Sequence, residues 1–355
     1  MSSATPPPPI RFVAIGGGTG LSTLLRGLKR HARRRPRRGT AWRGDAPSEP
    51  AIPPYIRELT AVVTVTDDGG SSGRLRRALR VLPPGDVRNC LVALSEDEAL
   101  MSRLFQYRFV TGWGLRGHNL GNLFLAGLTE LTGDFAEAVR LSSEVLAVQG
   151  RIYPSTTTNV HLEAELENGQ RVSGETKISR SRSRISRIQL APADCHPLPD
   201  TLEAIADADV ITLGPGSLFT SIVPNLLVRG VAEAVIASRA VKVYVGNLMT
   251  QPGETTGFTA AGHIRAIYSH SPAPFFHYAL LNSGEIPAQA QQRYRKEQAE
   301  PVAADLEEVR RLGVEPVLAD LTAPGTLVRH DPARLASEIL ELATRARVSA
   351  ADAPR

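Results

Sequence analysis

Glycine-rich and polar segments recur along this chain, and the first follows an apolar stretch at Arg11–Ile15. That stretch predicts a buried strand, and the leucines of Leu21–Lys29 have the spacing of a helix. Between them lie Gly16, Gly17, Gly18, Thr19 and Gly20. Glycines let backbone N–H groups approach a phosphate, and a helix start favours anions. The third glycine of a dinucleotide fingerprint and the Lys of a P-loop are both missing, so we expect a different phosphate site.

Two adjacent carboxylates, Asp67 and Asp68, follow a second β-branched strand that we expect over Leu59–Thr66. An acid at this place can bind a ribose hydroxyl, hold Mg²⁺ through its waters, or act as a base. Capping of a helix expected over Leu75–Val81 is the structural alternative. The sequence leaves these four roles open.

Further polar segments also suit a ligand. They contain Asn89, His118, Asn119, Asn122, Gly214, Gly216, Ser217, Asn247 and Gln251. Asp86, in the segment before Asn89, is explained as well by capping a helix over Asp86–Leu94, and His118 by a structural hydrogen bond. The carboxyl ends of parallel strands line one crevice, so we expect one composite binding site.

The elements that would position these segments alternate between strand and helix. Further strands are expected over Val210–Leu213, Val241–Val245 and Phe275–Asn282. Further helices are expected over Asp97–Phe109, Asn119–Leu131, Phe135–Leu146, Thr201–Asp207, Thr259–Ser269 and Asp331–Ala346, with a short or broken one over Leu218–Val228 that contains Pro224. This alternation predicts an α/β fold with a mainly parallel, doubly wound sheet covered on both faces.

The middle of the chain, about residues 155–190, has a different pattern. Antiparallel strands are expected over Thr157–Leu166, Arg171–Ile178 and Ile185–Leu190, with an Asn-Gly turn between the first two. Four arginines between Arg180 and Arg187 fit an exposed basic edge strand, or a grip on an anion. We therefore predict a small antiparallel insertion in the main sheet.

Composition excludes several classes of protein. The 355 residues are 42% hydrophobic but contain no long apolar run, so we expect a soluble, cytoplasmic protein without a membrane span. Two cysteines make a disulfide framework implausible, and the scattered histidines form no metal motif. No nucleophile elbow is present, so no catalytic residue is assigned.

The net charge of +5 is local, because eight basic residues and no acid lie between Lys29 and Arg43. The rest of the chain holds 33 basic and 36 acidic residues. We interpret residues 31–54, which also contain five prolines, as a disordered, solvated insertion. Nucleic acid or anionic lipid is the less favoured partner of this segment.

Several motifs in order resemble those of the gluconeogenesis factor family, bacterial proteins related to 2-phospho-L-lactate transferase. The motifs are IGGGTGLSTLLRGLK, TVTDDGGSSGRLR, LPPGDVRNCLVAL, GHNLGNLFLAGLTELTGDF, LGPGSLFTSIVPNLLV and NLMTQPGETTGFTA. The resemblance implies one Rossmann-like domain over residues 11–346, with tails at 1–10 and 347–355. It also implies binding of UDP-sugars, notably UDP-N-acetylglucosamine, and regulation of cell shape and wall synthesis during gluconeogenic growth.

In that family a Tyr and an Arg contact the nucleotide, and they match Tyr294 and Arg329 here. A tyrosine can stack on uracil, and an arginine can bind a pyrophosphate with two hydrogen bonds. The resemblance implies no settled catalytic activity and no cofactor. It leaves open a homodimer and an unidentified cell-wall regulatory protein as partners.

Two enzymes remain as alternatives to a regulator. One is a transferase of the phospholactate type, in which Asp67 and Asp68 would hold Mg²⁺. The other is a nicotinamide-dependent oxidoreductase, which the incomplete glycine fingerprint disfavours.

Overall fold

A computed structural model of the protein describes residues 9–32, 55–96, 98–181 and 183–351. Its centre is a seven-stranded sheet with the strand order β10-β9-β8-β7-β1-β2-β3, and every pairing in it is parallel. The strands are β1 (Ile10–Gly16), β2 (Ile56–Val63), β3 (Arg151–Pro154), β7 (Val210–Leu213), β8 (Val241–Val245), β9 (Tyr278–Asn282) and β10 (Glu315–Ala319). The predicted parallel α/β fold is confirmed. The predicted insertion at 31–54 and the N-terminal tail lie almost wholly outside the described residues.

The order of the strands reverses beside β1. In register, Val13 of β1 has Thr60 of β2 as its partner on one side and Ile211 of β7 on the other. The chain builds outward from β1 to β2 and β3, and then returns to begin the second half at β7. In open parallel sheets such a reversal leaves a crevice at the carboxyl ends of the strands, where ligands bind.

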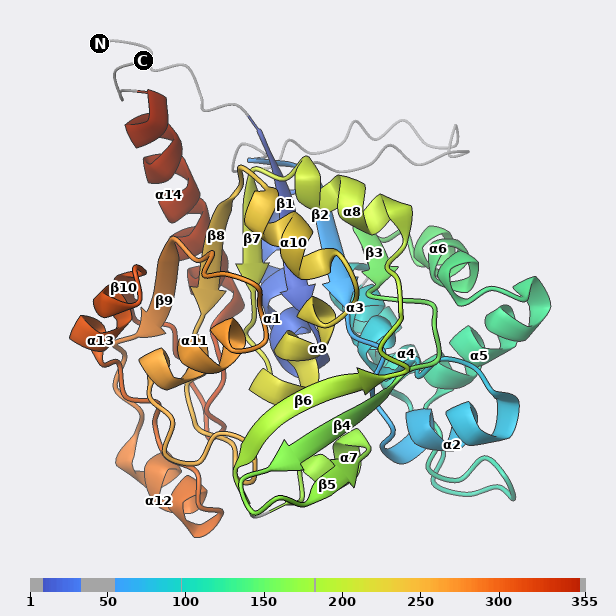
Figure 1. Ribbon diagram of the computed structural model, residues 1–355. Helices are drawn as coiled ribbons and strands as arrows, with labels where there is room; N and C mark the ends of the chain where they lie inside the picture. The colour runs from blue at the N-terminus through green and yellow to red at the C-terminus, as the bar shows by residue number, and fades with distance from the viewer. Residues whose placement is uncertain (1–8, 33–54, 97, 182, 352–355) are drawn as a thin grey trace.

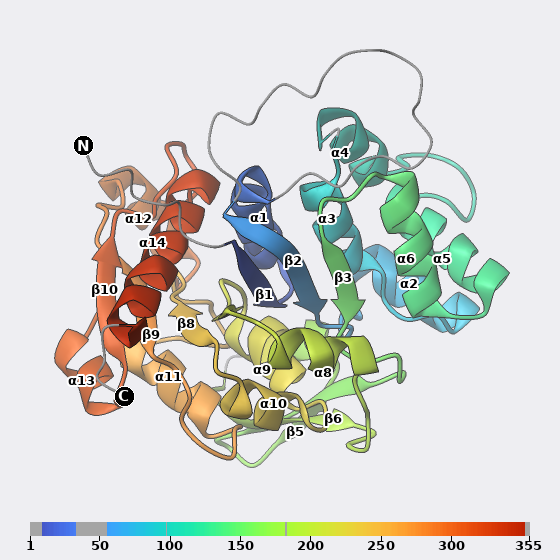
Figure 2. The ribbon, with the colours of Figure 1, turned by 90° about the horizontal axis from the view of Figure 1, so that it is seen from above.

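Helices cover both faces of this sheet (Figure 2). One face carries α1 (Gly18–Leu28), α3 (Gly85–Leu94) and α14 (Pro332–Ala351), with α1 in contact with both of the others. The opposite face carries α8 (Pro199–Ala206), α9 (Val223–Leu226), α10 (Val231–Ala237) and α11 (Ala260–Tyr268). Because both faces are covered, β1 and β7 are almost entirely buried, as their continuous apolar sequences require.

The first helix shows how the pattern of the sequence builds this core. Leu21, Leu24, Leu25 and Leu28 are all buried, so the helical spacing seen in the sequence corresponds to the face that packs on the sheet. Gly27 lies on the same helix, where an added Cβ would come within 1.9 Å of the Pro332 carbonyl oxygen. Glycine therefore permits the close contact between α1 and α14.

A separate three-stranded antiparallel sheet lies across the carboxyl edge of the main sheet (Figure 1). It consists of β4 (His161–Leu166) between β5 (Arg171–Ser173) and β6 (Ile185–Ala191). The prediction of a strand over Arg171–Ile178 is wrong beyond Ser173. Gly174 has a φ of +98°, which breaks the strand and starts the short helix α7 (Glu175–Ile178).

Several elements were not predicted from the sequence. They are the edge strands β3 and β10 and the helices α10, α12 (Ala288–Lys296) and α13 (Leu306–Arg311). Both edge strands contain a charged residue and a proline, as strands paired on one side tolerate. The predicted break at Pro224 is confirmed by a π-helical turn (Leu218–Ile222) that leads into α9.

Several other helices and strands begin or end at residues different from those predicted from the sequence. The second strand is β2, which ends at Val63, so Thr64 to Thr66 belong to the following loop. The helix expected from Leu75 is α2 (Gly70–Leu79), and the one expected to reach Phe109 is α4 (Glu98–Gln106). The last helix, α14, continues through Ala351 rather than ending at Ala346.

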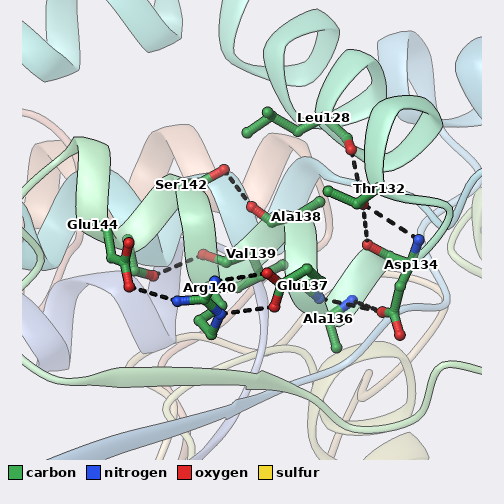
Figure 3. Close-up of polar contacts among 11 residues, drawn as sticks. Leu128, Thr132, Asp134, Ala136, Glu137, Ala138, Val139, Arg140, Ser142 and Glu144 are labelled. Carbon is green, nitrogen blue, oxygen red and sulfur yellow. Dashed lines mark hydrogen bonds and ion pairs between the residues drawn. The ribbon is translucent and has the colours of Figure 1, made fainter.

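The helix pair α5 (Leu120–Thr132) and α6 (Phe135–Val145) packs beyond β3, and a tight turn joins the two helices (Figure 3). Asp134 caps α6, because its carboxylate accepts the N–H groups of Ala136 at 2.6 Å and Glu137 at 3.2 Å. Within the described residues, no helix by itself has the length and apolar character to cross a membrane. The bent pair Leu218–Leu226 and Val231–Ala237 satisfies both measures jointly.

Candidate functional site

The loops that follow β1 and β7 touch one another at the reversal of the sheet. An added Cβ on Gly20 would lie 2.3 Å from the Pro215 carbonyl oxygen, and one on Gly216 would lie 3.4 Å from the Gly17 carbonyl oxygen. No side chain fits at Gly20, whereas a Cβ on Gly216 would make an ordinary contact. Gly20 is therefore the glycine required here to bring the two loops into contact.

The first loop ends in the N-terminus of helix α1, which begins at Gly18. The capping residue Gly17 has no side chain to cap this end, and the Gly18 N–H donates to the Asp86 carboxyl group. Gly18 itself has a φ of +63°, a conformation that favours glycine. The first N–H groups of a helix lack partners within it and carry the positive end of its dipole, so this loop can bind an anion.

The loop after β8 fixes the loop after β7 in place. Asn247 donates from Nδ2 to the Gly216 carbonyl oxygen at 2.8 Å and accepts the Gly216 N–H at 3.2 Å. Gln251 donates from Nε2 to Oγ of Ser217 at 2.8 Å. These bonds preorganise the Gly-Ser loop, although they also occupy polar groups that the sequence suggested would bind a ligand directly. Gly214, which directly follows β7, has a φ of +87°, a backbone conformation that favours glycine.

Two segments distant in sequence bring Tyr294 and Arg329 to the same place. Tyr294 lies on α12, and the chain after this helix is anchored to the β8 loop by a hydrogen bond from Thr250 N–H to the Glu300 carbonyl oxygen at 2.7 Å. Arg293 donates to the Thr326 carbonyl oxygen at 2.8 Å and so ties α12 to the loop that carries Arg329.

These loops enclose a hollow of about 230 Å³, which we call the loop hollow. Nine of the residues that the sequence suggested line it: Gly17, Gly18, Thr19, Gly216, Ser217, Asn247, Gln251, Tyr294 and Arg329. Amide-rich backbone, one aromatic ring and one guanidinium thus share a single cavity. Such a combination can hold a phosphorylated ligand that also carries a ring.

His330 also lines the loop hollow and was not predicted. Burial lowers its pKa from 6.5 to about 4, so the ring is neutral at physiological pH. Its Nε2 lies 3.1 Å from the Gly246 carbonyl oxygen and donates to it, which fixes the end of β8. The sequence around His330 did not predict that its ring would be shielded from water.

Asp67 and Asp68 lie outside the loop hollow, and their side chains diverge. Asp67 accepts the Gly69 N–H at 2.8 Å, whereas Asp68 accepts the N–H and the hydroxyl of Thr176 at 2.8 and 2.6 Å. Asp68 therefore fastens α7 to the main sheet. The part of the chain that the structure describes contains no group of three or more His, Cys, Asp or Glu side chains that could hold a metal ion. A magnesium ion held by Asp67 and Asp68 through its waters stays a prediction of the transferase alternative.

Asp86 is a carboxylate that lies against the loop Gly17–Gly20, which follows β1. It lies in the first turn of α3 rather than at the capping position, which is Pro84. An added Cβ on Gly17 would be 2.7 Å from its Oδ2. Burial, reinforced by Asp67, raises the pKa of Asp86 from 3.8 to about 7, against the opposing hydrogen bond from the Gly18 N–H.

Two more buried acids extend this group. Burial, with further repulsion from Asp67 and Asp86, raises the pKa of Glu175 well above its usual value. Burial also raises the pKa of Glu254, which accepts hydrogen bonds from Ser179 at 3.1 Å and Thr220 at 3.2 Å. We call Asp67, Asp86, Glu175 and Glu254 the acid cluster. Its members come from four separate segments, so no local motif reveals it.

The remaining polar residues that the sequence suggested hydrogen-bond to other protein groups. His118 shares a hydrogen bond with Ser71 through Nδ1 at 2.9 Å, and Asn119 donates to the Gln106 carbonyl oxygen. Arg88 donates to Asn122 at 3.0 Å and to Asn89 at 2.7 Å. The structure thus engages Asn89, His118, Asn119 and Asn122 with protein groups, and none of them lines the loop hollow. Gly16 lies at the end of β1 and does not line it either.

Comparison with known proteins agrees with this architecture. The gluconeogenesis factor of Bacillus subtilis is 46% identical over 334 residues, which cover 94% of this chain and 98% of that protein. The chain belongs to the gluconeogenesis factor family. A second member, from Halalkalibacterium halodurans, is 45% identical over 331 residues, with coverage of 93% of this chain and 95% of that protein.

The family is part of a wider group. A family model described as 2-phospho-L-lactate transferase CofD matches residues 12–322. A crystal structure of a UPF0052 family member from Bacillus halodurans superimposes with a TM-score of 0.84 at 44% identity, covering 94% of this chain and all of that one. The Rossmann-like α/β fold expected from the motifs is confirmed.

Proposed function

We propose that this member of the gluconeogenesis factor family is a non-catalytic regulator that binds a UDP-sugar, with UDP-N-acetylglucosamine as the ligand. The observation that carries the proposal is the loop hollow, in which two glycine loops, Tyr294 and Arg329 face one cavity. The Gly18 and Gly216 N–H groups already donate to Asp86 and Asn247, so the donors for a diphosphate are the N–H groups of Thr19 and Gly20 at the start of α1 and of Ser217 after β7.

Each end of the ligand has a chemically suitable neighbour. Arg329 is exposed at the rim, where a guanidinium can bind a diphosphate with paired hydrogen bonds. Tyr294 offers an aromatic ring to the nucleoside. On the opposite side of the phosphate loop, the acid cluster supplies carboxyl groups that can hydrogen-bond the hydroxyls of a sugar.

The regulatory part of the proposal rests on the family. Its members are named for gluconeogenesis. The resemblance of this chain to the family implies that it controls cell shape and cell-wall synthesis from the cytoplasm. Binding would then be the signal, and an unidentified cell-wall regulatory protein, or a second copy of the chain, would respond to the bound state.

Isothermal titration calorimetry with UDP-N-acetylglucosamine tests the binding. We expect saturable heat, and an affinity that falls at least tenfold, or about 1.4 kcal/mol, in Arg329→Ala and Tyr294→Ala. Arg295→Ala is the matched control, since this arginine is exposed on the same helix as Tyr294 and does not line the loop hollow. Absence of binding by the unaltered protein at millimolar ligand refutes the proposal.

A transferase is the second candidate, and Asp86 is the observation that favours it. A carboxyl with a pKa of about 7 beside a phosphate loop can accept the proton of an attacking hydroxyl. The match to 2-phospho-L-lactate transferase points to the same chemistry. The test is turnover with a lactyl-nucleotide donor and a deazaflavin acceptor. This candidate requires turnover that Asp86→Asn abolishes, and it fails if the unaltered protein gives none.

A further inference from the structure

A second hollow, of about 260 Å³, lies beyond the β8 loop, between the end of β9 and helix α12. We call it the β9 hollow. Its lining is apolar at Leu248, Leu281, Ile286 and Val302, among others. None of the residues that the sequence suggested belongs to it except Asn247. It has no role in the site described so far.

The two hollows share a wall. Asn247 and Leu248 line both of them, so only the β8 loop separates the phosphate-binding loops from the β9 hollow. Gln291 and Tyr294 are three residues apart on α12 and therefore on one face of it. Gln291 lines the β9 hollow and Tyr294 lines the loop hollow. One extended ligand can reach from the glycine loops into the β9 hollow.

The chemistry of the β9 hollow excludes a phosphate and suits a neutral ring. Its lining contains no Lys, Arg or His, and its one charged residue is Glu285, an exposed carboxylate. An anion would gain no cation there and would face this acid. A nucleobase or another flat, uncharged ring usually binds in an apolar pocket that has a few hydrogen-bonding groups.

The polar groups at the rim favour a ligand that donates hydrogen bonds. Gln291 donates from Nε2 to the Ile286 carbonyl oxygen at 2.8 Å, an arrangement that leaves its Oε1 to accept. Asn282 is already engaged, since its oxygen accepts the N–H groups of Gly284 and Leu321. Gln291 Oε1 and the Glu285 carboxylate are left to accept hydrogen bonds, and the Ser283 hydroxyl, which also lines the hollow, can donate or accept. The two acceptors match the N–H of a uracil and the hydroxyls of a ribose.

We propose that the β9 hollow holds the uridine end of the ligand. The base lies over the apolar floor, the ribose crosses the Asn247–Leu248 wall beside Tyr294, and the diphosphate lies on the glycine loops. The sugar then points toward the acid cluster. This inference rests on the proposed function and adds the direction in which the ligand lies and the part of the protein that selects its base.

Uridine, UDP and inorganic pyrophosphate as separate probes test this assignment. Saturation-transfer NMR detects weak binding of uridine, and calorimetry measures UDP, pyrophosphate and UDP-N-acetylglucosamine. The variant Ala304→Trp fills the β9 hollow from its lining. We expect it to abolish the uridine signal and weaken UDP at least tenfold, while pyrophosphate affinity stays unchanged. Arg329→Ala should show the opposite: weaker pyrophosphate binding and an unchanged uridine signal.

A milder pair of variants covers the case in which Ala304→Trp does not fold. Gln291→Ala should weaken uridine and UDP several-fold. Its neighbour Gln292→Ala, exposed on the same helix and outside the lining, should leave both unchanged. Thermal melts confirm that each variant is folded.

The outcomes separate the two proposals. Binding of UDP-N-acetylglucosamine that is unaffected by Ala304→Trp and Gln291→Ala overturns the β9 assignment and leaves the proposed function standing. Uridine binding that responds to these variants, without binding of UDP-N-acetylglucosamine, supports the assignment and overturns the proposed function. Absence of any uridine or UDP binding by the unaltered protein overturns the assignment as well.

Discussion

At the scale of single residues, the contact between the β1 and β7 loops depends on Gly20. We expect Gly20→Ala to force these backbones apart and to lower the free energy of unfolding by about 1–3 kcal/mol. Gly16→Ala is the control in the same segment, because its added Cβ would meet only Leu21 at 3.6 Å, an ordinary contact. Urea denaturation measures both. Equal losses in the two variants would contradict the role given to Gly20.

A second prediction concerns Asp86 and pH. Its pKa in the folded protein is raised from 3.8 to about 7, so between these values the folded state binds more protons than the unfolded state. The free energy of unfolding must therefore fall as the pH rises through this range. Asparagine at this position cannot ionise. From pH 5 to pH 8, Asp86→Asn should gain about 3 kcal/mol of stability relative to the unaltered protein, because the two units between pH 5 and the raised pKa contribute about 1.4 kcal/mol each.

Urea titrations of both proteins at pH 5 and pH 8 provide this comparison. A stability difference that does not change with pH would show that Asp86 ionises in the folded protein as it does in water.

The sequence predicts the glycine loops better than it predicts the surroundings of single polar residues. The glycine loops were predictable because closely spaced glycines between a strand and a helix are typical of a phosphate-binding turn. The partly buried positions of Asp86, Glu175 and His330 were not predictable from the sequence, because they depend on segments that meet only in the folded chain. His118 and Asn122 bond to Ser71 and Arg88 in the structure, and a ligand contact stays a prediction for both.

At the scale of elements, α6 offers a clean test of a local signal. Asp134→Ala removes the carboxylate that accepts two N–H groups at the start of this helix (Figure 3), which should cost about 1 kcal/mol of stability. Glu144→Ala breaks an exposed ion pair with Arg140 in the same helix and should cost less than about 0.5 kcal/mol. Thermal or urea unfolding compares them. A larger loss in Glu144→Ala would contradict this ranking.

The central strands were predictable and the edges were not, for a physical reason. β1 and β7 are buried on both faces and read as continuous apolar runs. Strands β3 and β10 pair on one side only, so charge and proline are tolerated there and the apolar pattern is weak. Over residues 171–178 the pattern suggested one strand, but Gly174 and the bonds from Thr176 to Asp68 turn the chain into α7.

At the scale of the whole molecule, the order of the strands explains why distant motifs form one site. The reversal beside β1 brings the loops of the first and second halves together, while α12 and the segment around Arg329 close the cavity from the β9 side. The motifs predicted which segments take part. Their division into a phosphate-binding part, an acid cluster and the β9 hollow required the three-dimensional arrangement.

The central claim is that a nucleotide sugar lies across the carboxyl edge of this sheet with its diphosphate on the glycine loops. A crystal structure of the protein grown with UDP-N-acetylglucosamine tests it most directly. We expect phosphate oxygens about 3 Å from the backbone nitrogens of Gly17, Thr19, Gly20 and Ser217, with Arg329 beside them. A diphosphate bound elsewhere, or these loops without ligand density at saturating concentration, would contradict it.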